Sequence, residues 1–280
     1  MIPQRNLSLL SNRLARTEGR RIVEAVLERD YCLAWFLVGL ARSPLRDALV
    51  FKGGTAVKRC YFGDYRFSED LDFTLAHPLE LEMIFAGLEP VYAEVQRASG
   101  IVFRFARADR NRHQNSHTFY LAYEGPLPAT SAKEVKVDIT IRERLVRPVE
   151  AHPVLRGYEE YADLPEDALV RVYGLDEIAV EKLVALTDKA RNEPRDIYDL
   201  WYLTSEGHVD FAGLLPEIED KLAFRARRRD SITGELAAKE ARLKKLWTVR
   251  LGPQMATIPP FEEVFRAVRR SLREAGLVER

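Results

Sequence analysis

Two aspartates in the first half of the chain have the spacing of a metal-binding pair. Asp70 and Asp72 are two residues apart in a strand-like segment, so both side chains should point to the same face of a sheet. Two carboxylates on one face repel each other unless a cation lies between them. Carboxylate oxygens are ligands that Mg²⁺ and Mn²⁺ prefer. The pair therefore predicts a site for one of these ions.

A third carboxylate, Asp138, lies in a segment from residue 134 to 141 in which apolar and polar residues alternate strictly, as in a half-buried strand. If this strand neighbours the first one, the three aspartates converge on one face of the sheet. That is the ligand set that a two-metal phosphoryl- or nucleotidyl-transfer site needs. Taken singly, an Asp-x-Asp pair or a lone aspartate on a strand is also typical of a solvated strand face.

A glycine turn precedes the aspartates. Gly53, Gly54 and Thr55 follow a short apolar run and precede a helical stretch, so the turn joins a strand to a helix. Backbone N–H groups at such a turn can hold phosphate oxygens, and Thr55 adds a hydroxyl. The P-loop pattern is absent, and two glycines also suit any tight turn. We interpret the turn as a triphosphate-binding element, with Lys58 as a further candidate ligand.

The segment KGGTAVKRCYFGDYRFSEDLDF, which contains these residues, resembles the signature of the AbiEii/AbiGii toxin-type nucleotidyltransferases. They belong, with the MenT-like toxins, to the DNA polymerase β-like superfamily. That superfamily shows Gly-[Gly/Ser], a spacer helix, Asp-x-[Asp/Glu] and a later carboxylate. The spacer here is long for the superfamily but suits this family, as does Arg-Phe-Ser at residues 66–68, which adds Ser68 to the nucleotide-binding set. Thr55 stands where many relatives carry Ser.

A second block lies further along, where residues 176–191 predict a helix. Lys182 is set in its apolar stripe, so its charge needs a partner or an opening to solvent. The next helix carries Asp196 and Asp199 on one face, although an aspartate in a first helical turn also suits the helix dipole. EKLVAL followed by EPRDIYDLWYL again resembles the toxin family. The resemblance implies active-site roles for Lys182, also as a triphosphate ligand, and for Asp196, with Asp199 as the alternative.

The resemblance implies a metal-dependent nucleotidyltransferase. Asp70 and Asp72 would hold two Mg²⁺ (or Mn²⁺) ions, and Asp138 would complete one metal site and accept the proton of the attacking hydroxyl. The implied acceptor is RNA, especially the 3′ end of tRNA, with growth arrest as the outcome and a cognate antitoxin as partner. Two alternatives stay open: a non-catalytic nucleotide- or partner-binding module of the same fold, and a nucleotidyltransferase acting on a protein or a small molecule.

Charge is distributed unevenly along the chain. Its 43 basic and 43 acidic residues balance, but the segment Lys221–Arg250 holds ten basic and three acidic residues. Such a segment could follow a nucleic-acid backbone, and we predict it as an RNA contact. A solvated helical face is the alternative.

The elements that must position these groups suggest three parts. We expect an N-terminal helical segment at residues 1–45, a nucleotidyltransferase α/β domain at 46–150 and a helical domain at 165–280 that closes the nucleotide cleft. The α/β domain should be a mixed polymerase β-like sheet with flanking helices. Prolines at 148, 153 and 165 indicate a linker, and Pro90 predicts a kink or break in a helix over 79–98.

Composition indicates a soluble globular protein. Of the 280 residues, 46% are hydrophobic and 31% charged, which excludes disorder as the main state. Cys32 and Cys60 cannot form a disulfide framework and suggest a reducing compartment. The longest apolar run, residues 31–41, is too short to span a bilayer, and the first residues lack a secretory signal. We therefore expect a cytoplasmic protein with no membrane partner.

Overall fold

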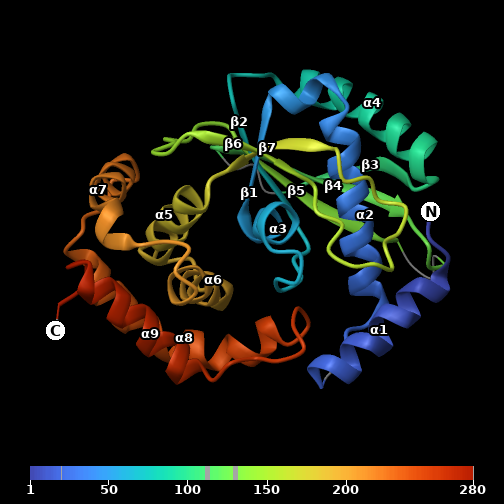
Figure 1. Cartoon of the computed structure of the whole chain (residues 1–280). Helices are drawn as coiled ribbons and strands as arrows, with labels where there is room; N and C mark the ends of the chain where they lie inside the picture. Colours follow the sequence, from blue (N-terminus) through green and yellow to red (C-terminus); the bar gives the residue numbers. More distant parts are fainter. Residues whose placement is uncertain (20, 111–113, 129–131, 280) are drawn as a thin grey trace. The chain divides into compact units, whose positions relative to one another are not determined.

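The computed structural model describes the chain except residues 20, 111–113, 129–131 and 280 (Figure 1). It divides into two compact units, residues 1–143 with 149–172 and residues 144–148 with 173–280. The N-terminal residues 1–45, which we expected as a separate segment, therefore cluster with the first unit. Within the described residues, no helix has the length and apolar character that crossing a membrane requires.

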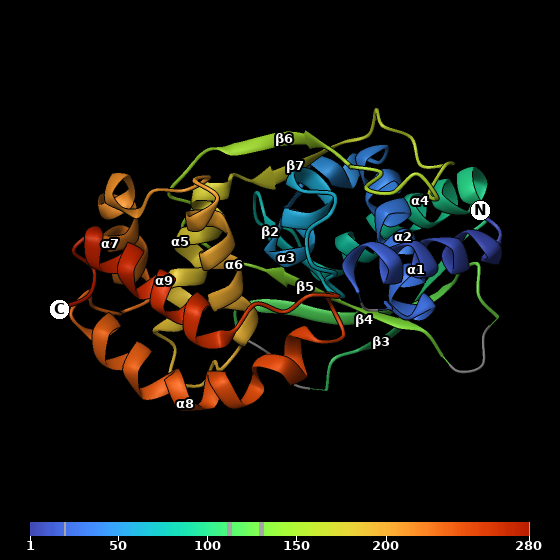
Figure 2. The same ribbon diagram turned by 60° about the horizontal axis from the view of Figure 1, so that its bottom comes forward.

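A mixed sheet forms the centre of the first unit, as the sequence predicted (Figure 2). Within the described residues it has seven strands in the order β3-β4-β5-β2-β1-β7-β6. Pairs β1–β7 and β2–β5 are parallel, whereas β1–β2, β3–β4 and β4–β5 are antiparallel. The strands are β1 Leu49–Lys52, β2 Leu71–Leu75, β3 Val102–Ala108, β4 Ser116–Glu124, β5 Glu134–Thr140, β6 Val149–Pro153 and β7 Leu169–Tyr173.

One face of this sheet is apolar. Alternation along the central strands places Phe51, Phe73 and Ile139 in one row across β1, β2 and β5. The rings of Phe51 and Phe73 lie 5.3 Å apart, and all three side chains are buried. Burying this row fixes the register of the central strands, because a shift of one residue would exchange the two faces.

The helical part of the first unit comprises α1 Gln4–Glu18, α2 Glu24–Ala41, the 3-10 helix η1 Pro44–Asp47, α3 Gly53–Ala56, the π-helix η2 Val57–Tyr61 and α4 Leu81–Ser99. The apolar run at residues 31–41 is the buried half of α2, and α4 packs against it. At Gly39 a Cβ atom would lie 2.5 Å from a methyl group of Val95, so glycine allows the close approach of the two helices.

Helix α4 runs through Pro90 as one element, so a break at this proline was a wrong prediction. Proline lacks one backbone donor, and in isolation it weakens a helix. Here Leu88 and Val91, on either side of the proline, are both buried. Packing of this apolar face therefore offsets the local cost.

Two further strands lie where prolines suggested a linker. Strand β7 pairs in parallel with β1 through Val172 and Phe51, and β6 forms the edge beside it. The region at 150–165 that we expected to separate two domains therefore lies within the first unit. The second unit begins its helices directly after β7.

The second unit is helical, with α5 Leu175–Leu186, α6 Pro194–Ser205, the 3-10 helix η3 Phe211–Leu214, α7 Leu215–Phe224, α8 Ser231–Leu251 and α9 Phe261–Glu274. Helix α6 packs against α5, α8 and α9. Helices α8 and α9 run side by side in opposite directions (Figure 2). Lys244 of α8 pairs with Glu262 at the start of α9, and Arg229, just before α8, donates to the carbonyl of Gly276 after α9.

Candidate active site

A row of polar side chains crosses the face of the sheet opposite to the apolar row. The register pairs Lys52 of β1 with Asp72 of β2, Asp72 with Asp138 of β5, and Asp138 with Thr118 of β4. Residues directly opposite each other on neighbouring strands share a face. The expected juxtaposition of Asp72 and Asp138 is therefore present. The Thr118 hydroxyl donates to Oδ2 of Asp138 at 2.9 Å and orients that carboxylate.

Asp70, the third predicted ligand, lies immediately before β2 rather than within it. Its backbone carbonyl accepts a hydrogen bond of 2.6 Å from the Thr55 hydroxyl, which ties the start of β2 to the glycine turn. Asp70 and Asp72 are both half-buried, so their carboxylates lie at the boundary between protein and solvent.

A lysine that no sequence pattern singled out lies among the three aspartates. Lys136 is two residues before Asp138 on β5, and its Nζ lies 3.5 Å from Oδ2 of Asp138. Burial alone would lower the pKa of Lys136, but the negative charges of Asp138, Asp70 and Asp72 outweigh burial and raise it. The three carboxylates thus act on one common cation. Its position in the alternating strand, on the same face as Asp138, was the signal that could have identified it.

The fit of these residues to a divalent metal depends on how their carboxylates are arranged. Among the described residues, no three His, Cys, Asp or Glu side chains are gathered into a ready metal-binding cluster. The predicted three-aspartate group is therefore not preassembled, and Lys136 is one of the cations beside it. The chemistry of the donors nevertheless fits, because half-buried carboxylates that already attract a cation are suitable ligands for Mg²⁺ or Mn²⁺.

The glycine turn lies directly against this polar row. Gly53 has a φ of +80°, and a Cβ atom there would lie 2.6 Å from Oδ2 of Asp72. At Gly54 a Cβ atom would lie 2.6 Å from Nη2 of Arg66 and 3.2 Å from Oγ of Ser68. The positive φ at Gly53 favours glycine, and a Cβ atom at Gly53 or Gly54 would displace the side chain of Asp72 or of Arg66. The turn, Ser68 and Asp72 are thus brought together as the sequence motif suggested.

Lys58 does not join them. It is fully buried, and its ammonium donates to the carbonyls of Gly63 and Tyr65, both at 2.9 Å, and to the hydroxyl of Tyr158 at 3.1 Å. An ammonium enclosed by three oxygen acceptors fixes the loop that follows η2 and is not available to a triphosphate. Its prediction as a nucleotide ligand is therefore wrong.

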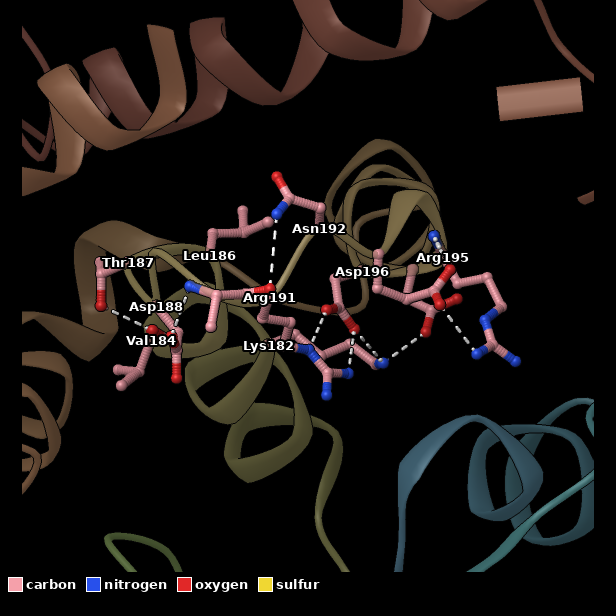
Figure 3. A network of polar contacts seen from close by, with 12 residues as sticks. Lys182, Val184, Leu186, Thr187, Asp188, Arg191, Asn192, Arg195 and Asp196 are labelled. Carbon is pink, nitrogen blue, oxygen red and sulfur yellow. Dashed lines mark hydrogen bonds and ion pairs between the residues drawn. The ribbon is translucent and has the colours of Figure 1, made fainter. Parts of the chain in front are cut away.

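In the second unit, Lys182 of α5 is buried between two carboxylates of α6 (Figure 3). Its Nζ lies 3.1 Å from Oδ1 of Asp196 and 2.6 Å from Oδ2 of Asp199. The side chain is 10% exposed, and those of the two aspartates are 1% or less. The sequence left open whether the charge of Lys182 is met by a partner or by an opening to solvent. The structure shows a partner, because both candidate aspartates hold the ammonium.

Arg191 completes this cluster and was missed from the sequence. Its Nε and Nη2 donate to the two oxygens of Asp196 at 2.6 and 3.1 Å, as Figure 3 shows. Burial raises the pKa of Asp196, but the charges of Lys182 and Arg191 outweigh burial and hold the pKa below its ordinary value. Two cations and two anions therefore balance inside this unit. The helix predicted over residues 176–191 ends at Leu186, so Arg191 lies in the connection between α5 and α6.

The basic segment Lys221–Arg250 is only partly a surface. Lys221 is fully buried in an ion pair with Glu177, and Lys239 donates to the carbonyls of Leu186 and Asp188. Burial lowers the pKa of Lys239. These two lysines hold neighbouring helices together, so the prediction that the whole segment contacts RNA is wrong for them. Several other cations of the segment, including Arg242, Lys245 and Arg250, are exposed.

Comparison with known proteins relates the chain to one family. The family model described as "Nucleotidyl transferase AbiEii toxin, Type IV TA system" matches residues 35–269. Among solved structures, the chain is similar to MenT4, a nucleotidyltransferase toxin from Mycobacterium tuberculosis H37Rv, with a TM-score of 0.62 and 19% identity. The match covers 95% of this chain and 89% of that one, and it shows the fold. A comparison with curated proteins gave no match.

Proposed function

The chain belongs to the AbiEii family of nucleotidyltransferase toxins of type IV toxin–antitoxin systems, and from this premise we propose a metal-dependent transfer of a nucleoside monophosphate from an NTP to RNA. The proposed acceptor is the 3′ end of tRNA in the cytoplasm, and the proposed outcome is growth arrest that a cognate antitoxin counteracts. The observation that carries the proposal is the in-register pair Asp72–Asp138 beside the glycine turn.

The carboxylates of Asp72 and Asp138, together with Asp70, would hold the divalent ion. When bound, the ion supplies positive charge for the reacting phosphates and for the attacking hydroxyl. The chain contributes orientation: Thr118 fixes Asp138 by its hydrogen bond, and Thr55 fixes the backbone at Asp70. Asp138 is the proposed acceptor of the proton from the RNA hydroxyl.

The glycine turn is the proposed phosphate-binding element. With no side chain at Gly53 and Gly54, the backbone approaches Asp72, Arg66 and Ser68 closely. This leaves backbone donors beside the carboxylate row, where the phosphates of an NTP–metal complex would be held. The hydroxyl of Ser68 is a further candidate donor.

Lys182 is proposed to supply positive charge to the nucleotide, as its place in the family motif implies. Its buried pairing with Asp196 and Asp199 supports a positioning role for the aspartates.

Labelled NTPs incubated with total RNA and Mg²⁺ test the proposal. We expect label in the tRNA fraction, and Asp72→Asn should slow transfer about 1000-fold, or ~4 kcal/mol in the barrier, because a ligand of the charge-stabilising ion is lost. The matched control is Asp167→Asn in the same unit, whose side chain is 79% exposed and pairs with Arg42. It should retain full activity.

The outcome separates the alternatives. Label in protein or in a small molecule would replace RNA as the acceptor. Binding of NTP without release of pyrophosphate, for every RNA tested, would make the chain a binding module. Wild-type rates for Asp72→Asn and Asp138→Asn, with both variants folded by circular dichroism, would reject the assigned site.

A further inference from the structure

The outer face of α9 carries a group of arginines that no motif includes. Five apolar residues form the buried face of this helix: Phe261, Val264, Phe265, Val268 and Leu272. Arg266, Arg269, Arg270 and Arg273 follow the spacing i, i+3, i+4 and i+7, which places them together on the other side. No acidic residue occurs between residues 264 and 273.

These arginines form no close ion pair, although the charge of Arg266 acts on Glu262, one turn earlier on α9. Arg266, Arg270 and Arg273 are exposed and Arg269 is half-buried. Across the part of the chain that the structure describes, none of the four forms an ion pair or a side-chain hydrogen bond. Other cations of this unit do have ion-pair partners: Lys244 pairs with Glu262, and Arg229 pairs with Glu219. The four guanidinium groups of α9 therefore have no close ion-pair partner among the described residues of the unit.

We infer that this α9 arginine face, defined as Arg266, Arg269, Arg270 and Arg273, docks the phosphate backbone of the nucleic-acid acceptor. The inference rests on the proposed function for the kind of polymer bound. A guanidinium forms paired hydrogen bonds to phosphate, and it keeps its charge at any physiological pH. Seven residues of helix rise about 10 Å, over which one strand of a duplex presents about three phosphates.

A nucleic acid fits this face better than a folded protein does. Protein interfaces are centred on buried aromatic and apolar anchors. The large apolar residues that are exposed among the described part of the chain include Phe105, Phe224 and Val249, but none lies on α9. The small residues Ala267 and Ser271 lie between the arginines, so a phosphate backbone can approach the helix closely. Contacts of this kind set affinity and orientation rather than sequence choice.

The test compares two pairs of arginines within one chain. Arg270→Gln/Arg273→Gln changes the α9 arginine face, and Arg5→Gln/Arg16→Gln makes the same charge change on α1, where both arginines are exposed. Fluorescence anisotropy with tRNA, without NTP, measures affinity across a series of salt concentrations. We expect the α9 variant to bind about tenfold more weakly and to lose about 2 from the log–log salt slope, roughly 1 per phosphate contact. The α1 control should match the wild type.

Every outcome bears on the inference. Equal affinity and salt slope for the α9 variant and the wild type would overturn it, and so would an equal loss in the α1 control. Loss of antitoxin binding with RNA binding intact would identify a protein surface instead. Because binding is measured without catalysis, RNA that binds through α9 but is never labelled would refute the proposed function and leave the docking surface standing.

Discussion

Replacing Lys182 by methionine tests the buried cluster of the second unit most directly. Methionine is close to the aliphatic part of lysine in size but carries no charge. The change removes the Lys182 ammonium from Asp196 and Asp199, both almost fully buried, while Arg191 still pairs with Asp196. An uncompensated charge inside a protein is costly, so the variant should be much less stable than the wild type.

The expected loss is about 3 kcal/mol in the free energy of unfolding, the lower end of the range for breaking a buried ion pair, because Arg191 still holds Asp196. The loss should depend on pH. In the wild type the pKa of Asp196 lies below its ordinary 3.8, so the stabilisation is fully present above about pH 4 and disappears as pH falls through the lowered value. In the variant the charge of Lys182 no longer lowers the pKa of Asp196, so this pKa should rise and the difference from the wild type should shrink on acidification.

Urea unfolding followed by tryptophan fluorescence measures this loss, because Trp201 and Trp247 both lie in the second unit. The double variant Lys182→Met/Asp199→Asn removes one charge of each sign and should recover more than half of the lost stability. A single variant within about 0.5 kcal/mol of the wild type would refute the account, as would a double variant no more stable than the single one.

Two further predictions concern the sheet. Gly53→Ala should lower the thermal stability by more than Gly19→Ala does. Both glycines have φ near +80°, a conformation that costs alanine about 1–2 kcal/mol of stability, but only at Gly53 would the new Cβ atom also press against Asp72. Equal losses would contradict this packing. Lys136→Met should tighten Mn²⁺ binding about two- to fivefold in calorimetric titration, because it removes the cation 3.5 Å from Asp138. Weaker binding would instead make Lys136 part of the ligand-holding arrangement.

The central strands could be predicted from the sequence because their pattern is local. Alternation in residues 134–141 identified β5, and the apolar run before the glycines identified β1. Strands β6 and β7 could not: β6, at the edge of the sheet, is short, polar and bounded by prolines, and β7 pairs with β1, which is distant in the chain. Such a strand is defined by its partner in the sheet, which no local pattern specifies.

The same distinction holds for the candidate site. Asp72, Asp138 and the glycine turn were found because spacing and strand alternation imply their positions. Lys136 was overlooked although it shares a strand face with Asp138, whereas Lys58 was misassigned because its surroundings depend on residues distant in the chain. Tyr158, one acceptor for Lys58, is 100 positions away in the sequence.

The parallel pairing of β2 with β5 means that the polar row with the candidate site forms only when the two strands pair in the correct register. Ile139 faces the core beside Phe73, and its neighbour Asp138 faces the polar row beside Asp72. A pairing displaced by one position would bury a carboxylate in the hydrocarbon interior and expose isoleucine to water. Chains mispaired in this way would be unstable, so a cell making this toxin would not accumulate stable, mispaired copies of it.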